Sequence, residues 1–237
     1  MKIRLGVIGE EENINILQEV IEEYNDYEIT AFIDPDGTHT LNIIDNHQQE
    51  FDSWLVFDQI NYLHIKNWGK AQKPVYYIPY RGASFYKTLC TAIYQGFKID
   101  ELSIDTIPYY DITRALDDMQ INYNVINHLS DEHGALSLNG YAAFHRELFK
   151  KGITKAAVTK SCYVKNLLES EGIPAFCIMP VRVTVRNILN VILTQFRIKK
   201  LREGQIAVQV FSFNLLGDKD NFYSVDDLYS REPRAAA

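Results

Sequence analysis

The sequence predicts an α/β protein of two similar lobes, each a parallel sheet of about four strands with helices on both faces, and a cleft between the lobes. Three observations support this fold class. Short apolar runs alternate with segments of helical periodicity, the alternation starts again near residue 100, and the second series aligns with the first. Strands that alternate with helices of this length form parallel sheets whose faces the helices cover.

The first half of the chain contains four predicted strands, each followed by a helix. The strands are short apolar runs, and the helices place apolar side chains on one face. The predicted strands are 3–8, 28–33, 54–57 and 75–78, and the predicted helices are 13–24, 41–49, 60–68 and 84–94. The residues Asp34-Pro35-Asp36-Gly37 are typical of a turn and end the second strand.

The second half repeats this order. Its predicted strands are 102–104, 123–129, 156–159 and 175–178, and its predicted helices are 112–119, 141–149, 163–169 and 184–198. Beyond residue 204 the pattern changes, since residues 205–213 alternate like a strand that either extends the second lobe or begins a following domain. We therefore expect a first lobe over 1–98, a second over 99–204 and a tail over 205–237. The ending Arg234–Ala237 is either a cloning scar or a natural Ala-rich terminus.

An internal repeat relates the two halves. Residues 54–94 align with 156–194 across one short gap, after which the offset is 100 residues and Pro74 falls on Pro174. Chance similarity between βα units is the alternative, but four units in matched order favour duplication. In parallel sheets, ligands bind beyond the carboxyl ends of the strands, so we expect the two sets of loops to face one cleft.

Composition and charge exclude several classes of function. The chain has 31 acidic and 24 basic side chains, a formal net charge of −7 and 46% hydrophobic residues. This is enough for a buried core, but the acidic balance is unlike a nucleic-acid-binding surface. No apolar run reaches the roughly 18 residues that span a bilayer, and the N-terminal segment is unlike a signal peptide.

The cysteines and histidines predict no metal site, no cofactor and no disulfide framework. The three cysteines are unevenly spaced, and the six histidines show no HExxH pattern. This usage is typical of a reducing compartment, so we expect a cytoplasmic protein. The first loop, Gly9–Glu12, lacks the glycine pattern of dinucleotide binding, and Asp105-Thr106 are expected to cap the helix that follows Pro108.

Candidate ligand-binding residues follow the third and fourth strands of each lobe. They are Asp58, Gln59, Tyr80, Arg81, Gly82 and Ser84 in the first lobe, and Lys160, Ser161, Cys162, Arg182 and Thr184 in the second. The cations Arg81, Lys160 and Arg182 lie near helix N-termini, whose free N–H groups favour an anionic ligand. Ser84 and Thr184 also stand where helix N-caps are expected, which is the structural explanation of these two residues.

Cys162 is the one candidate nucleophile. It stands at a predicted helix start beside Lys160, where the helix dipole would lower the pKa of its thiol. Two-lobed racemases of the aspartate/glutamate type use one cysteine from each lobe, but the position equivalent to Cys162 is Ile60, which cannot transfer a proton. A lyase or isomerase with one cysteine therefore stays open, beside the alternative of a small buried side chain.

Several segments resemble the N-terminal sensor domain of propionate-catabolism activators. They are RALDDMQINYNVINHL, FHRELFKKGITKAAVTKSCYVKNLLESEGIPAFCI, VRVTVRNILNVIL and, more loosely, FDSWLVFDQINYLHIKNWGKAQKPVYYIP. The chain departs from that family at Thr159-Lys160-Ser161, where a Gly-rich segment is usual. The resemblance implies a cytoplasmic two-lobed sensor module, similar in fold to periplasmic binding proteins and attached to a transcriptional or signalling output.

Our first hypothesis is thus a non-catalytic sensing domain that binds a small, anionic metabolite between its lobes. We expect no nucleic-acid or membrane contact through this chain, and pairing into a homodimer stays open. The alternatives are a small-molecule lyase or isomerase that uses Cys162 in the same cleft, and an interaction module with a vestigial cleft.

Overall fold

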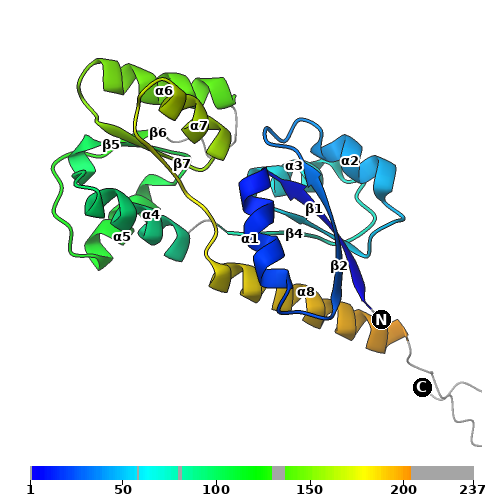
Figure 1. Cartoon of the computed structure of the whole chain (residues 1–237). Coiled ribbons are helices and arrows are strands. Elements are labelled where there is room, and N and C mark those ends of the chain that lie inside the picture. The colour runs from blue at the N-terminus through cyan, green and yellow to red at the C-terminus, as the bar shows by residue number, and fades with distance from the viewer. Residues whose placement is uncertain (1, 58, 80–81, 130–136, 204–237) are drawn as a thin grey trace, which may run out of the picture. The chain divides into compact units, whose positions relative to one another are not determined.

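Strands and helices alternate along the computed structural model, which describes residues 2–57, 59–79, 82–129 and 137–203 (Figure 1). The strands are β1 Ile3–Gly9, β2 Tyr27–Ile33, β3 Ser53–Val56, β4 Val75–Tyr77, β5 Leu102–Asp105, β6 Asn127–Leu129, β7 Ala156–Thr159 and β8 Ala175–Cys177. The helices are α1 Glu11–Ile21, α2 Thr40–His47, α3 Gln59–Trp68, α4 Ala83–Tyr94, α5 Tyr109–Asp118, α6 Leu138–Lys150, α7 Cys162–Ser170 and α8 Arg182–Glu203, with a 3₁₀ turn at Ile99–Glu101. Each strand and helix predicted up to residue 198 is present, with ends that differ by a few residues.

Two sheets of four parallel strands confirm the predicted fold class. Their strand orders are β2-β1-β3-β4 and β6-β5-β7-β8, and every pairing in both sheets is parallel. The second order is the first with each strand number raised by four, as duplication predicts. The offset of 100 residues persists in the edge strands, because β2 and β6 begin at Tyr27 and Asn127, and β4 and β8 at Val75 and Ala175.

Three of the four inner strands, β3, β5 and β7, are buried along their whole length. This burial suits the mainly apolar runs of β3 and β7, whereas in β5 the buried polar residues Ser103 and Asp105 alternate with apolar ones and contact His145. In the first sheet, Gly6 of β1 leaves room for the aromatic pair Phe51 and Trp54, whose ring centroids lie 4.7 Å apart. A side chain at Gly6 would occupy the space that the Trp54 ring fills.

The helix that follows the last strand of each sheet contacts the other sheet. Helix α4 follows β4 but packs against β8, and the hydroxyl of Tyr86 donates to Asp118 of α5 at 2.7 Å. Helix α8 follows β8, yet the hydroxyl of Tyr27 in β2 donates to the carbonyl of Leu189 in α8. The two sheets therefore exchange helices, and the lobe boundaries at residues 98 and 204, which rest on chain order alone, stay a prediction.

Three arginines of α8 also pair with acidic residues on or just after α1. Arg182 contacts Glu19 and Arg186 contacts Glu23, each at 2.6 Å, and Arg197 contacts Asp26 at 3.0 Å. These side chains are largely exposed, and exposed ion pairs contribute little free energy. The buried apolar residues Val185, Leu189 and Ile192 therefore contribute more to the position of α8 than these ion pairs do.

The chain divides into two units, residues 1–197 and 198–237. Helix α8 continues across this division, and the second unit is described only over residues 198–203. The predicted strand over 205–213 and the tail of the chain lie outside the described residues. None of the described helices is long and apolar enough to cross a membrane.

The predicted N-caps Ser84 and Thr184 are wrong. Helix α4 begins at Ala83 with Gly82 as its N-cap, at a φ of 66° that favours glycine. Helix α8 begins at Arg182, so Thr184 lies inside its first turn. Ser84 is fully buried within α4 instead of standing in front of it.

We predict that Gly6→Ala destabilises the protein. The added Cβ atom would collide with the ring of Trp54 and lie 3.1 Å from Phe51, and both rings are buried. Overpacking of this kind costs about 1–3 kcal/mol. Urea unfolding followed by circular dichroism measures the change, and an unfolding midpoint equal to or above that of the wild-type protein would contradict the expectation.

Candidate ligand-binding site

A cavity of about 340 Å³ lies where strands of both sheets end. Its lining residues come from loops and helix starts of both halves of the chain: Gly9, Glu10, Asn13, Asp34, Pro35, Asp36, Gly37, Thr38, Phe57, Ile60, Asn61, His64, Asp105, Thr106, Leu138, Tyr141, Thr159, Lys160 and Ser161. Because all strands are parallel, their carboxyl ends lie at one edge of each sheet, where ligands of such folds bind. The volume is in the range of small-molecule sites.

The structure brings only part of the predicted site together. Lys160 and Ser161 line the cavity. Gln59, Gly82, Ser84, Cys162, Arg182 and Thr184 are not among its lining residues, and Asp58, Tyr80 and Arg81 lie outside the described residues. Arg182 pairs with Glu19 on α1, and Gly82 lines a second cavity of about 290 Å³ between α4 and α5. The ligand roles of all eleven residues stay a prediction.

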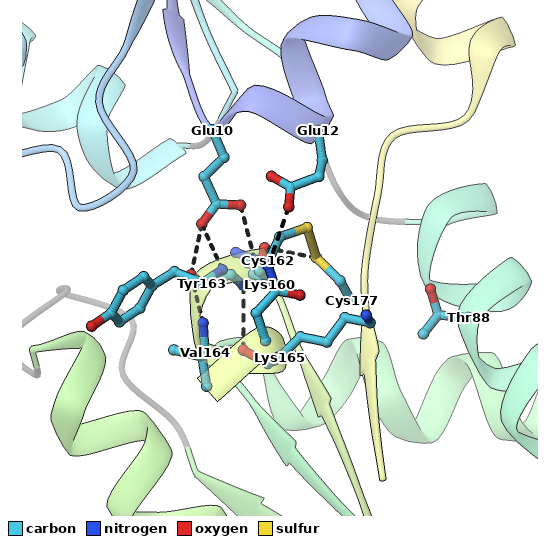
Figure 2. Close-up of a disulfide and its surroundings, with 12 residues drawn as sticks. Glu10, Glu12, Thr88, Lys160, Cys162, Tyr163, Val164, Lys165 and Cys177 are labelled. Atoms are coloured by element: carbon cyan, nitrogen blue, oxygen red, sulfur yellow. Dashed lines mark hydrogen bonds between the residues drawn. A yellow bond between two sulfur atoms is a disulfide. The ribbon is translucent and has the colours of Figure 1, made fainter. Parts of the chain in front are cut away.

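Glu10 links the two halves of the chain by a polar contact beside the cavity. It precedes α1, and its carboxylate is bound by the first turn of α7 (Figure 2). The hydroxyl of Ser161 donates to Glu10 Oε1 at 2.7 Å, and the backbone N–H of Cys162 donates to Oε2 at 2.9 Å. The N–H of Tyr163 adds a longer bond of 3.4 Å. The α7 N-terminus thus already binds an anion, which comes from the chain itself.

Burial changes the acidity of this carboxyl group. Glu10 is 8% exposed, and desolvation raises its pKa above the usual value, while the hydrogen bonds from Ser161, Cys162 and Tyr163 act in the opposite direction. The carboxylate of Glu12 raises the pKa further. Desolvation is the larger effect, so protonation of Glu10 favours the folded state.

A second buried pair, His145 and Asp105, joins α6 to the end of β5. His145 Nε2 lies 3.0 Å from Asp105 Oδ2, and its Nδ1 lies 2.7 Å from the hydroxyl of Ser103. Asp105 also accepts a bond from the hydroxyl of Thr106 at 2.8 Å and one from the N–H of Lys160 at 3.3 Å. The predicted capping role of Asp105 and Thr106 is therefore wrong. Helix α5 has Pro108 as its N-cap, with no side-chain cap bond.

Asn13 carries the strongest indication of a missing partner. It lies on the first turns of α1, is 3% exposed and lines the cavity. Its Oδ1 atom is buried with no hydrogen-bond partner among the described residues. In contrast, Asp34 is held locally, since it accepts bonds from the hydroxyl of Thr40 at 2.7 Å and from the N–H of His39. A buried acceptor without a donor costs free energy. A ligand that enters the cavity and donates a hydrogen bond to Asn13 Oδ1 would remove this cost.

Cys162 is bonded to Cys177 in a disulfide whose Cα atoms lie 5.4 Å apart. The prediction that the cysteines form no disulfide framework is thus wrong for two of them. The pairing was missed because 15 residues separate them in the sequence and only the β7–β8 pairing brings them together. Among the three cysteines, Cys90 is free and exposed. Because a disulfide holds no thiolate, Cys162 cannot act as a nucleophile in this state.

The fold is similar to that of known regulators and binding proteins. A crystal structure of an NtrC-family transcriptional regulator from Clostridium acetobutylicum matches with a TM-score of 0.61 and 14% identity, over 84% of this chain and 99% of that one. A periplasmic solute-binding protein from Actinobacillus succinogenes with bound D-allose has a TM-score of 0.43, 14% identity and coverages of 87% and 94%. A LacI-family transcriptional regulator from Enterococcus faecium with bound ribose has a TM-score of 0.36, 13% identity and coverages of 71% and 72%.

The first of these similarities confirms the predicted two-lobed fold. No family model matches the chain, and the comparison with curated proteins gives no match. The chain thus shares its fold with a transcriptional regulator of known structure.

We predict that Glu10 makes the stability of the protein pH-dependent. The pKa of Glu10 is raised in the folded state, so the folded protein binds the proton more tightly than the unfolded chain does. The free energy of unfolding, relative to that of Glu10→Gln, should therefore fall as the pH rises from the unfolded pKa, about 4.3, through the raised folded value, and then level off.

Urea unfolding of both proteins between pH 4 and 8 measures this difference. Glu11→Gln is the matched control, because Glu11 is the exposed neighbour of Glu10. A stability difference between wild type and Glu10→Gln that rises with pH would show that hydrogen bonds, and not desolvation, dominate at Glu10.

Proposed function

We propose that this chain is the ligand-sensing domain of a regulator, and that it binds a small polar metabolite in the cavity between its two sheets without catalysing a reaction. One observation carries the proposal: the cavity is lined by strand ends of both sheets and contains the buried acceptor Asn13 Oδ1, which has no hydrogen-bond partner within the described part of the chain. The fold that it shares with an NtrC-family transcriptional regulator supports the same assignment.

Both sheets contribute to the cavity wall, which gives a physical route from binding to signalling. Glu10 and Asn13 belong to the first half of the chain, and Thr106, Tyr141 and Lys160 to the second. A ligand that contacts both sets favours one relative arrangement over others, by the difference in its affinity for them. The same domain would then report ligand binding to an output domain elsewhere in a cytoplasmic regulator.

The charged side chains of the cavity wall determine which ligand charge the cavity favours. Lys160 is the lysine of the cavity wall, which also carries the carboxylates of Glu10, Asp34, Asp36 and Asp105. Glu10, Asp34 and Asp105 are each held by hydrogen bonds within the protein. We propose that an anionic ligand carries a single negative charge and binds next to Lys160, because further charges would meet the carboxylates.

A thermal-shift screen tests the proposal with monosaccharides, polyols, carboxylic acids and sugar phosphates. A ligand at 100 times its dissociation constant should add about 2.7 kcal/mol of stability. In the variant Asn13→Ala, the affinity for that ligand should fall about tenfold or more, because the amide no longer accepts a bond in the cavity. Asn187→Ala is the matched control, since Asn187 is exposed on α8 and is not a lining residue.

No shift with any of these compounds would contradict the sensing proposal and favour an interaction module. Equal loss of affinity in Asn13→Ala and Asn187→Ala would place the ligand outside the cavity.

Lys160→Gln separates anionic from neutral ligands. If the ligand is anionic, the variant should weaken its binding, measured by isothermal titration calorimetry, and the loss should shrink at high salt. Neutral sugars and polyols should bind the variant with unchanged affinity. An acid that binds Lys160→Gln and the wild-type protein equally well would remove Lys160 from the recognition of the anion.

A further inference from the structure

Glu10, Cys162 and Cys177 bring three potential metal ligands together. One carboxylate oxygen and the two sulfur atoms all lie within 4.8 Å of one another. The residues come from three segments, the turn before α1, the first residue of α7 and the last residue of β8 (Figure 2). Thiolate sulfur and carboxylate oxygen are both ligands of protein-bound Zn²⁺.

The chemistry of each donor suits a metal once the disulfide is reduced. Glu10 Oε2 accepts a hydrogen bond from the N–H of Cys162, and a carboxylate oxygen has a second lone pair that can bind a metal. Cys162 is the first residue of α7, where the helix N-terminus stabilises a thiolate. Glu10 and Cys162 are also buried, which limits competition from water.

We propose that the reduced protein binds Zn²⁺ through Cys162 Sγ, Cys177 Sγ and the carboxylate of Glu10, and that disulfide formation releases the ion. Three protein ligands leave the fourth position of a tetrahedral ion for water or another small ligand. The site is independent of the proposed sensing function, since it needs no metabolite. It joins segments of the two sheets at the edge of the cavity, whose wall includes Glu10 and Ser161.

The redox step balances with a dithiol as the reductant. One thiolate of the dithiol attacks the Cys162–Cys177 bond, which releases one cysteine as a thiolate and leaves the other in a mixed disulfide. The second thiolate of the dithiol then attacks the mixed disulfide, which releases the other cysteine and turns the dithiol into a disulfide. The cysteines take up two protons as thiols and release them again when Zn²⁺ binds, because the metal ligands are thiolates. A disulfide oxidant reverses the exchange and expels Zn²⁺, since the bonded sulfurs no longer carry negative charge.

Titration of the full chain with Co²⁺, followed by Zn²⁺, tests the site. The protein is reduced with excess dithiol, freed of it under argon and compared with the oxidised protein. We expect the reduced protein to show the sulfur-to-cobalt charge-transfer band and the intense visible bands of four-coordinate Co²⁺, and to lose both when Zn²⁺ is added. The oxidised protein should show neither.

Variants assign the ligands. Cys162→Ser and Cys177→Ser should each abolish the charge-transfer band of two thiolates, and Glu10→Gln should weaken Zn²⁺ binding about tenfold or more while both thiolates remain. Cys90→Ser is the matched control, because Cys90 is exposed and unpaired, and it should bind Zn²⁺ as the wild-type protein does.

A thiol assay on the wild-type protein keeps the test decisive if a variant fails to fold. Without metal, all three thiols of the reduced protein should react with a disulfide reagent, the buried Cys162 more slowly than the exposed Cys90. Zn²⁺ should slow the reaction of Cys162 and Cys177 and leave that of Cys90 unchanged. The proposal is overturned if the reduced protein shows no charge-transfer band, if Zn²⁺ leaves the reactivity of all three thiols unchanged, or if Cys90→Ser alone loses the metal.

Discussion

The buried carboxylate of Glu10, bound by the first turn of α7, is the contact on which the arrangement of the candidate site depends. Removal of a charged group from water is costly, and here three donors from Ser161, Cys162 and Tyr163 offset part of the cost. The α7 dipole acts in the same direction. Since Glu10 precedes α1 and the donors begin α7, this one interaction ties the loops of the two sheets to each other.

Duplication accounts for the position of this contact, and divergence accounts for its chemistry. Helices α3 and α7 occupy equivalent places after β3 and β7, but Ile60 of α3 stands where α7 has Cys162. The first half of the chain therefore supplies the anion and the second half supplies the helix N-terminus that binds it. The pair His145 and Asp105 adds a further polar group to the second half alone. Two copies of one architecture thus form an asymmetric cavity.

The exchanged helices connect this cavity to the rest of the chain. Helix α4 packs on β8, and α8 packs through Val185 and Leu189 and through the hydroxyl of Tyr27 against the first half. Each sheet therefore shares a buried surface with a helix that follows the other sheet. Helix α8 then continues past residue 197 into the second unit of the chain.

The amino-acid sequence by itself determined the fold class, the order of the elements and the repeat of two halves. These features depend on local periodicity, on turn residues such as Asp34-Pro35-Asp36-Gly37, and on apolar runs such as Ala156–Thr159, all of which are visible in a short window of sequence. The same reasoning placed Lys160 and Ser161 at the carboxyl end of a strand, where they line the cavity.

Only the tertiary structure decided which distant residues meet. In the sequence, Glu10 is one acidic residue of the loop Gly9–Glu12, and the helix that binds it lies about 150 positions away in the chain, as the bond to Ser161 shows. Parallel pairing of β7 with β8 brings Cys162 and Cys177 together, and the contact between α8 and α1 directs Arg182 to Glu19. Such contacts depend on sheet order and helix exchange, which no local pattern encodes.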